Sequence, residues 1–424
     1  MTRHFWVLIH RYVGLYMAFF LLVAGLTGSI MAFEIQIQNW LNPPVTVVPQ
    51  ASPKLDALTL RERALTWVPQ GRLDTVSFTG KADEAYTVTM VIPLDATTGK
   101  PEELVQLSLN PYTGEEMARE KVVAEEFWPI TRKNFIPLII ALHYRLALPG
   151  SIGIWLFGIA ALLWTVDCFV GAYLTFPLHV RRRLDDVRVT PVMPRKSWWL
   201  RWKPSWLVKW RASAFRINFD LHRAGGLWVW LMLLVLAWSS VGLNLSEQVY
   251  APVMKALFNR PEDPIAALPS LPIPQLEPVL GWRQSHRIGQ RFMAEQANIH
   301  VFKVQDEMQF GYIPEKGVFW YAVTSDRDIT DAGGGTFLVF DATTAKLLGL
   351  SLPTGQNVGT TLHNWIFALH FALIWGLPFK LFVCLVGIVT AMLSITGVYI
   401  WFKKRRARHL SKERQTKLAD GTNA

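Results

Sequence analysis

The sequence has few charged residues for its length. Lys, Arg, Asp and Glu together make up 18% of the 424 residues, whereas ordinary globular chains contain roughly a quarter. Hydrophobic residues make up 51%, and the aromatic residues include 19 Trp and 24 Phe. This composition excludes a disordered chain, argues against a soluble enzyme and indicates extensive contact with lipid.

Two further absences narrow the chemistry. The chain has two cysteines, Cys168 and Cys384, and both lie within apolar runs. This argues against a disulfide framework and against a Cys-ligated zinc or iron–sulfur site. The sequence also lacks a Rossmann-like Gly-x-Gly-x-x-Gly run, so we expect no nucleotide cofactor bound by the chain itself.

Long apolar runs are present instead. Four segments are long and apolar enough to cross a bilayer, which takes about 20 apolar residues. They run from about residue 5 to 33, 152 to 176, 215 to 245 and 369 to 402. The first is too long for a signal peptide and no small-x-small cleavage site follows it, so we interpret it as an uncleaved anchor.

The positive charge is concentrated in three segments. The formal net charge of +11 would by itself be compatible with a nucleic-acid partner. However, residues 180–216 carry eleven Lys or Arg against two acids, the tail after Phe402 carries eight, and Arg3 and Arg11 lie at the start of the first span. Because excess Lys and Arg mark the cytoplasmic side, we predict that both termini and this loop are cytoplasmic, with no nucleic-acid partner.

Tryptophans recur every fourth residue in the basic loop, at Trp198, Trp202, Trp206 and Trp210. With basic residues among them, this spacing is typical of an interfacial helix that turns its aromatic rings toward lipid. The alternative interpretation is an aromatic belt at the membrane surface with no other role.

The two regions between the spans are mildly acidic. Helical spacing covers residues 58–68 and 289–298, and strand patterns cover residues 85–92, 104–109, 300–304, 318–324 and 336–340. We therefore predict two small α+β domains on the face opposite the basic segments, which is the periplasm in a bacterium.

The chain repeats itself in two halves. The first span begins His10-Arg-Tyr-Val-Gly-Leu and the third begins His222-Arg-Ala-Gly-Gly-Leu, while Ala-Leu-His143 precedes the second span and Ala-Leu-His370 precedes the fourth. The second and fourth spans end in Gly171-Ala-Tyr and Gly397-Val-Tyr. Small residues share a helix face with the first histidine of each half; they are Gly14, Gly25 and Gly28, matched by Gly226, Ala237 and Ser240.

The predicted fold class is therefore a polytopic α-helical membrane protein. Its four-helix transmembrane bundle comes from two repeats and carries two periplasmic α+β domains. The predicted segments are a first span in 1–33, a first outer region in 34–135, an outer helix and second span in 136–179, a basic Trp-rich cytoplasmic interfacial loop in 180–214, a third span in 215–246, a second outer region in 247–362, a fourth span in 363–402 and a basic cytoplasmic tail in 403–424.

Duplicated histidines in membrane helices point to a cofactor, because ionisable residues there are costly and usually functional. His10 and His222 lie near the cytoplasmic ends of their spans, and His143 and His370 lie at the outer ends. Two imidazoles facing each other across a bundle are what a six-coordinate b-type haem needs. The sequence thus predicts two b-type haems, one at each membrane face; polar residues that only join helices are the alternative interpretation.

Other polar residues have less defined roles. Arg11 and Arg223 are candidates to pair with the propionates of the inner haem, and Arg145 with those of the outer haem. His363, which has no counterpart in the first half, is an alternative outer ligand or a group near a substrate site. Asp167 lies inside the second span, where it would relay protons, orient a ligand or hydrogen-bond between helices. Zinc or copper has less support, because no Cys or carboxylate joins these histidines at ligand spacing.

The predicted haem levels are far apart if every span is a straight helix. Glu34, at the outer end of the first span, would lie about 36 Å from His10 along the helix axis. Helix breaks at Leu148-Pro149-Gly150 and at Gly376-Leu377-Pro378 would bring the outer histidines inward.

The order of these motifs resembles the PepSY-associated transmembrane family, and the resemblance covers nearly the whole chain. The outer regions are similar to PepSY domains, with residues 58–69 as the helix and Asn110-Pro-Tyr-Thr-Gly-Glu as the turn. The second turn, Asp341-Ala-Thr-Thr-Ala-Lys, lacks the glycine.

The resemblance implies a function. Members of this family include bacterial inner-membrane ferric-siderophore reductases such as ferrioxamine reductase, which are di-haem proteins that release iron in the periplasm. It implies haem ligation by His10, His222, His143 and His370, with a quinol or a cytoplasmic reductase as electron donor. The alternatives are a haem-free PepSY membrane protein that senses or binds a partner, and an electron-transfer subunit of another periplasmic enzyme.

Overall fold

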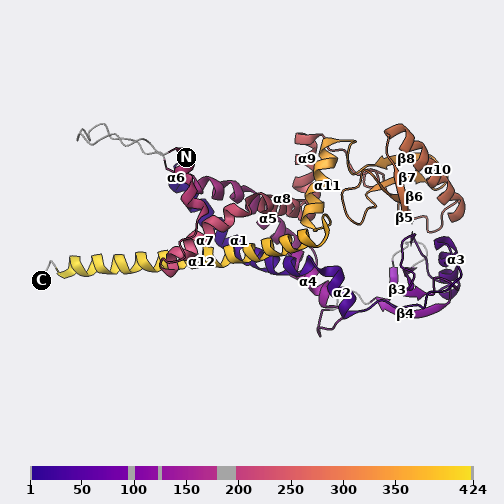
Figure 1. Ribbon diagram of the computed structural model, residues 1–424, viewed down its shortest axis with the longest axis horizontal. Coiled ribbons are helices and arrows are strands. Elements are labelled where there is room, and N and C mark those ends of the chain that lie inside the picture. The colour runs from indigo at the N-terminus through magenta and orange to yellow at the C-terminus, as the bar shows by residue number, and fades with distance from the viewer. Residues whose placement is uncertain (1, 94–100, 123–126, 179–196, 422–424) are drawn as a thin grey trace. The chain divides into compact units, whose positions relative to one another are not determined.

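The chain forms two compact units, shown as ribbons in Figure 1. The computed structural model describes residues 2–93, 101–122, 127–178 and 197–421. The membrane unit comprises Met1–Glu34, Leu138–Tyr250 and Leu377–Ala424, and the sheet unit comprises Ile35–Pro137 and Ala251–Gly376. The first part of the predicted basic loop, residues 180–196, lies outside the described residues.

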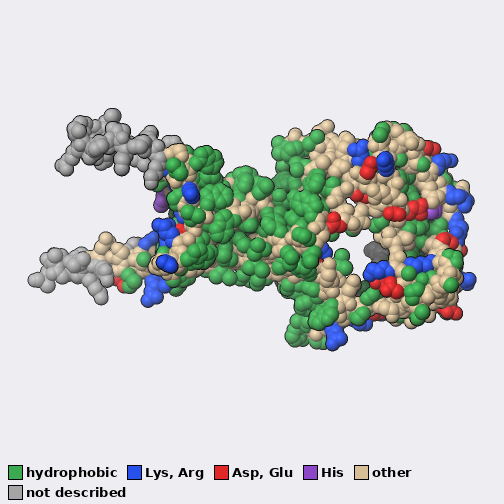
Figure 2. All heavy atoms as spheres, in the orientation of Figure 1, with side chains coloured by type: hydrophobic (Ala, Val, Ile, Leu, Met, Phe, Trp, Pro, Cys, Tyr) green, Lys and Arg blue, Asp and Glu red, His purple; other side chains and the backbone are tan. Residues whose placement is uncertain are grey.

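Apolar helices build the membrane unit. Among the described residues, three helices are long and apolar enough to cross a membrane: α1 (Arg3–Met31), α5 (Ile152–Thr175) and the Gly376–Ser411 part of α12 (Gly376–Gly421). Hydrophobic side chains cover these helices in Figure 2, and Lys and Arg gather where α12 leaves its apolar part. A membrane protein is therefore confirmed.

The third predicted span is not one straight helix. It divides into α7 (Ala214–Trp228) and α8 (Trp230–Asn244), which meet at Val229 with a bend of 72°. No proline lies at the bend, and Gly225 and Gly226 precede it by about one turn of α7. The two flanking indoles donate to different partners: Trp228 to the Trp206 carbonyl at 3.1 Å, and Trp230 to the Cys168 carbonyl at 2.9 Å. The bent pair is a fourth span only if both helices are counted together.

The helices break near the expected points. The helix α4 (Phe135–Arg145) ends before α5, and Leu146 and Ala147 adopt left-handed backbone conformations in the connection. The helix α11 (Val358–His370) ends before α12 begins at Gly376. The predicted fourth span, 363–402, therefore begins on one helix and continues on another.

Two antiparallel sheets form the centre of the sheet unit. The strands β2 (Tyr86–Pro93), β3 (Pro101–Leu109) and β4 (Glu116–Val122) pair in that order. The second sheet has the order β1-β5-β6-β7-β8; its strands are Thr75–Ser77, Val304–Ile313, Val318–Ser325, Thr336–Asp341 and Leu347–Ser351. The remaining described helices of the sheet unit are α2 (Glu34–Leu41), α3 (Ala57–Trp67), α9 (Ala251–Phe258) and α10 (Trp282–His300). The membrane unit also contains α6 (Trp198–Trp202) and the short helical turns Lys203–Trp206 and Ser246–Tyr250.

The two outer regions share one core, although the sequence pattern treats them as separate domains. The strand β1 of the first region pairs with β5 of the second, which places Val76 opposite Phe310. Both side chains are fully buried and belong to one apolar cluster that draws residues from both regions. The regions therefore depend on each other for burial of apolar surface.

Both family-like turns have the same form. The Asn110 side chain accepts from the N–H groups of Tyr112 and Thr113, and the Asp341 side chain accepts from those of Thr343 and Thr344. The fifth residue of each turn is left-handed, with φ of 75° at Gly114 and 57° at Ala345. The second turn thus keeps its shape without the glycine.

Replacement of Phe310 by Ala is expected to destabilise both outer regions together. Removal of a fully buried phenylalanine ring typically costs about 3 to 5 kcal/mol, and here the cavity would open in the shared core. Hydrogen exchange of the full-length protein should become faster in α3 as well as in β5. Ile299→Ala, at a side chain that is 66% exposed, should change stability by less than about 0.5 kcal/mol. Faster exchange confined to residues 282–351 would contradict a shared core.

Candidate functional site

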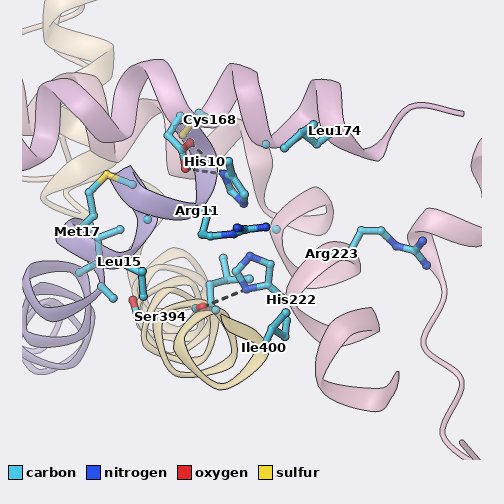
Figure 3. Close-up of a pocket in the computed structure, with 18 of the residues that line it drawn as sticks. His10, Arg11, Leu15, Met17, Cys168, Leu174, His222, Arg223, Ser394 and Ile400 are labelled. Carbon is cyan, nitrogen blue, oxygen red and sulfur yellow. Dashed lines mark hydrogen bonds and ion pairs between the residues drawn. The ribbon is translucent and has the colours of Figure 1, made fainter. Parts of the chain in front are cut away.

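The membrane unit contains a cavity of about 440 Å³ between its helices, within the range of small-molecule sites. Residues of α1, α5, α7, α8 and α12 line it, and most of them are apolar. His10, Arg11 and His222 are among its few polar residues (Figure 3). We call it the histidine cavity.

His10 is fixed by a buried carboxylate on the facing helix. Its Nδ1 lies 2.9 Å from both carboxylate oxygens of Asp167, which belongs to α5. One turn further along α5, a Cβ atom at Gly171 would lie 3.5 Å from Cε1 of the His10 ring. The glycine therefore lets the imidazole approach α5 closely while its Nδ1–H donates to Asp167.

His222 is fixed in the equivalent place on α12. Its Nδ1–H donates to the Leu393 carbonyl and to the Thr396 hydroxyl oxygen, each at 3.1 Å. A Cβ atom at Gly397 would lie 3.2 Å from Cε1 of this ring. Asp167 and Leu393 each lie four residues before the glycine of the repeated Gly-x-Tyr motif, so the two halves use the same position with different acceptors.

The two rings are spaced as axial ligands of one metal ion would be. Their centroids are 6.0 Å apart and their planes are inclined by 65°. Nitrogens that ligate an ion at about 2 Å from opposite sides would place the two ring centroids about 6 Å apart. Because both Nδ1 atoms donate hydrogen bonds, the lone pair of each ring is on Nε2, the nitrogen that would ligate a metal ion. The donor set therefore fits a bis-histidine haem iron.

The two candidate arginines differ in their partners. Arg223 donates to the Pro204 carbonyl at 2.6 Å and to Asp220 Oδ1 at 3.0 Å. Asp220 is fully buried and also accepts from Arg216 at 2.9 Å, so this carboxylate holds Arg223 in place on α7. Both arginines line the histidine cavity, but the Arg11 side chain lies beside the two imidazoles whereas that of Arg223 points away from them (Figure 3), so Arg11 is the better placed of the two for a propionate. Arg145 donates to the Leu148 carbonyl at 2.9 Å.

The small residues on α1 have different neighbours. Gly14 lines the cavity, and a Cβ atom there would have nothing within 4 Å. Gly25 instead packs on α12, since its Cβ would lie 2.6 Å from the Gly387 carbonyl oxygen. Gly28 faces a different histidine, His143. The small residues predicted to share one face of α1 thus have three different neighbours. Gly14 borders the cavity, Gly25 contacts α12 and Gly28 faces the His143 ring.

His143 lies against α1 on the membrane unit. Its Nδ1 is 3.0 Å from Oγ1 of Thr27, whose hydroxyl donates to the Val23 carbonyl at 2.7 Å. Its Nδ1–H therefore donates to the Thr27 hydroxyl oxygen. The Nδ1–H groups of His10 and His222 also act as donors, each to its own acceptor. Thr27 is seventeen residues beyond His10, or about 26 Å along the helix, so the break after α4 brings His143 inward from the level of Glu34.

The remaining candidates lie on α11, in the sheet unit. The His363 ring centroid is 4.4 Å from that of Phe367, and the His370 ring centroid is 5.2 Å from that of Phe371. Because His370 belongs to a different unit from His143, an outer haem held by this pair stays a prediction. Within the described ranges, no three His, Cys, Asp or Glu residues are grouped as a metal site.

Sequence reasoning missed two of the groups that position His222. Thr396 looks like an ordinary helix residue, and the Leu393 carbonyl belongs to the backbone, so neither has a side-chain signature. One sequence signal could have indicated the Leu393 position: Leu393 lies four residues before the glycine of the second Gly-x-Tyr motif, as Asp167 does before the first.

Comparison with known families gives one match. The model of the family described as PepSY-associated TM region matches residues 7–404, which is nearly the whole chain. No curated protein matches the chain.

Replacement of Gly14 by Phe is expected to block the histidine cavity. A ring at this position would enter the open space beside the imidazoles rather than displace a neighbouring side chain. Absorbance titration of the purified protein with haem should then show at least a tenfold loss of affinity. Leu26→Phe, at a side chain on α1 that is 50% exposed, should bind haem as the unmodified protein does. Equal binding by all three proteins would show that this cavity is not where haem is held.

Proposed function

The chain belongs to the PepSY-associated transmembrane family, and on this premise we propose that it is a haem-carrying reductase of the bacterial inner membrane. It takes electrons from a quinol or a cytoplasmic reductase and reduces a ferric siderophore in the periplasm. In this proposal both termini are cytoplasmic and two b-type haems are held, one at each face.

The observation that carries the proposal is the geometry of His10 and His222. Their 6.0 Å centroid separation suits two imidazoles that would share one iron. Their Nδ1 hydrogen bonds, to Asp167 and to the Leu393 carbonyl, leave the lone pair of each ring on Nε2, the nitrogen that would hold the iron. A purely structural role would also leave the adjacent cavity of about 440 Å³ without explanation.

The residues of the cavity have distinct tasks. A bound haem supplies a one-electron carrier, because its iron cycles between Fe(III) and Fe(II). His10 and His222 would hold the iron through Nε2, and Arg11 would pair with a propionate. Asp167 keeps the His10 ring in the tautomer with its proton on Nδ1 and makes Nε2 a stronger donor. The walls from α1, α5 and α12 surround the two imidazoles mainly with apolar side chains.

Release of iron follows from the preferences of the substrate ion. Siderophores hold Fe(III) through hard oxygen ligands, and Fe(II) is a poorer match for them. Addition of one electron to the ferric complex therefore weakens the chelate. We place the encounter with the siderophore on the sheet unit, which contains both antiparallel sheets.

An absorbance spectrum of the purified protein tests the proposal directly. The reduced protein is expected to show the Soret and α bands of a b-type haem. His10→Ala and His222→Ala should each lose the haem of the histidine cavity, about half of the total, because an iron with one axial imidazole is held more weakly. His300→Ala, at an exposed position on α10, should retain full haem content. A colourless protein, or unchanged haem in both cavity variants, would favour the haem-free alternative.

Reduction of a ferric siderophore is a separate test. Protein reduced with dithionite and freed of excess reductant should be reoxidised when ferrioxamine is added, with one Fe(II) trapped per electron by ferrozine. Haem bands that stay reduced in the presence of the ferric chelate would instead favour an electron-transfer subunit for another enzyme.

Replacement of Asp167 by Asn is expected to raise the midpoint potential of the haem in the histidine cavity. The carboxylate makes the His10 imidazole more electron-rich, which favours Fe(III) over Fe(II). If the ratio by which the site favours Fe(III) over Fe(II) falls tenfold to hundredfold, the midpoint potential rises by about 60 to 120 mV. Thr396→Val should shift the potential much less, since the Leu393 carbonyl still accepts from His222. Redox titration followed by absorbance measures both, and equal shifts would rule out a special role for the carboxylate.

A further inference from the structure

A second cavity lies between α1 and α12, at the ends of these helices that carry basic residues. It has a volume of about 320 Å³, and we call it the basic pocket. It is lined by Arg11, Tyr12, Trp401, Lys404, Arg405, Arg408 and His409. Four of these seven side chains carry a fixed positive charge and none carries a negative charge.

Helical spacing makes the charges converge on this pocket. Trp401, Lys404, Arg405 and Arg408 recur at intervals of three and four residues, which places them on one face of α12. Lys403 and Arg406, on the same stretch of helix, do not line the pocket. The basic residues of the tail are thus divided between a face that meets α1 and a face that does not.

The positive charges of the pocket lie together with no acidic residue in its lining. Across the part of the chain that the structure describes, no ion pair includes Arg11, Lys404, Arg405 or Arg408. Convergent like charges repel one another, and an anion that accepts several hydrogen bonds would relieve this repulsion. Phosphate oxygens suit arginine, which binds them with two parallel hydrogen bonds.

The position of the pocket identifies the source of the phosphate. Trp401 and Tyr12 are aromatic residues of the kind that lie at the level of lipid headgroups, and the apolar run of α12 ends beside them, at Phe402. Basic pockets between membrane helices bind anionic headgroups. We propose that the basic pocket binds the headgroup of an anionic phospholipid.

The lipid site adjoins the histidine cavity. Arg11, Trp401 and Lys404 line both spaces, so a bound headgroup lies next to the residues that close the cavity. Arg405 and Arg408 line only the basic pocket. Variants at these two positions therefore test the lipid site without altering the histidine cavity.

Native mass spectrometry of the full-length protein in detergent tests the proposal, with phosphatidylglycerol and phosphatidylcholine as probes. The unmodified protein should bind phosphatidylglycerol at least tenfold more tightly than phosphatidylcholine. Arg405→Gln combined with Arg408→Gln should weaken phosphatidylglycerol at least tenfold. Arg405→Lys combined with Arg408→Lys, which keeps the charges, should retain most of the binding and shows that the tail tolerates substitution.

A matched variant and a soluble anion complete the experiment. Lys403→Gln combined with Arg406→Gln removes the same charge from the other face of α12 and should change binding less than twofold. Equal loss in both neutralised variants would mean general attraction to negative charge, and would overturn the site. Millimolar inorganic phosphate should not displace the lipid. Displacement would identify a soluble phosphate as the occupant and would overturn the lipid proposal.

Discussion

The hydrogen bond that fixes each imidazole on the facing helix governs how the membrane unit is arranged. A buried polar group is costly unless it has a partner, so the partner of each ring determines which helices meet. In the first half, the bond from His10 to Asp167 joins α1 to α5. In the second half, the bonds from His222 to Leu393 and Thr396 join α7 to α12. The bend at Val229 separates α7, whose His222 bonds to α12, from α8, which packs on α5.

Glycine has two uses in this arrangement, and both depend on the missing side chain. At Gly171 and Gly397 the space admits an imidazole ring. At Gly25 and Gly387 it admits the backbone of the other helix, with each carbonyl oxygen close to the facing glycine. Close backbone approach is a common way to pack membrane helices. The first use positions the imidazoles, and the second fixes the distance between α1 and α12. These two helices contribute walls to both cavities.

The sequence predicts some of these features well because their signals are local. The apolar runs predict α1, α5 and the apolar part of α12, and residues 58–68 predict α3 to within one residue at each end. The bend in the third span escaped prediction because no proline marks it, and the acceptors of Trp228 and Trp230 are backbone carbonyls of distant residues, which have no sequence signature. A strand expected at residues 300–304 begins only at Val304, because α10 continues to His300. The shared core joins Val76 to Phe310, a long-range pairing that no local pattern reports. In the cavity, the repeat revealed both histidines, whereas a backbone acceptor such as the Leu393 carbonyl has no sequence signature.

The difference between Asp167 and Leu393 has a consequence for how such a molecule can arise. A homodimer of the first half would place two carboxylates against one pair of rings, and a homodimer of the second half would place none against them. A tandem copy whose halves diverge independently can place a single anion on one side of the pair. Gene fusion therefore gives this protein an asymmetry of charge that no symmetric assembly of one half could reproduce.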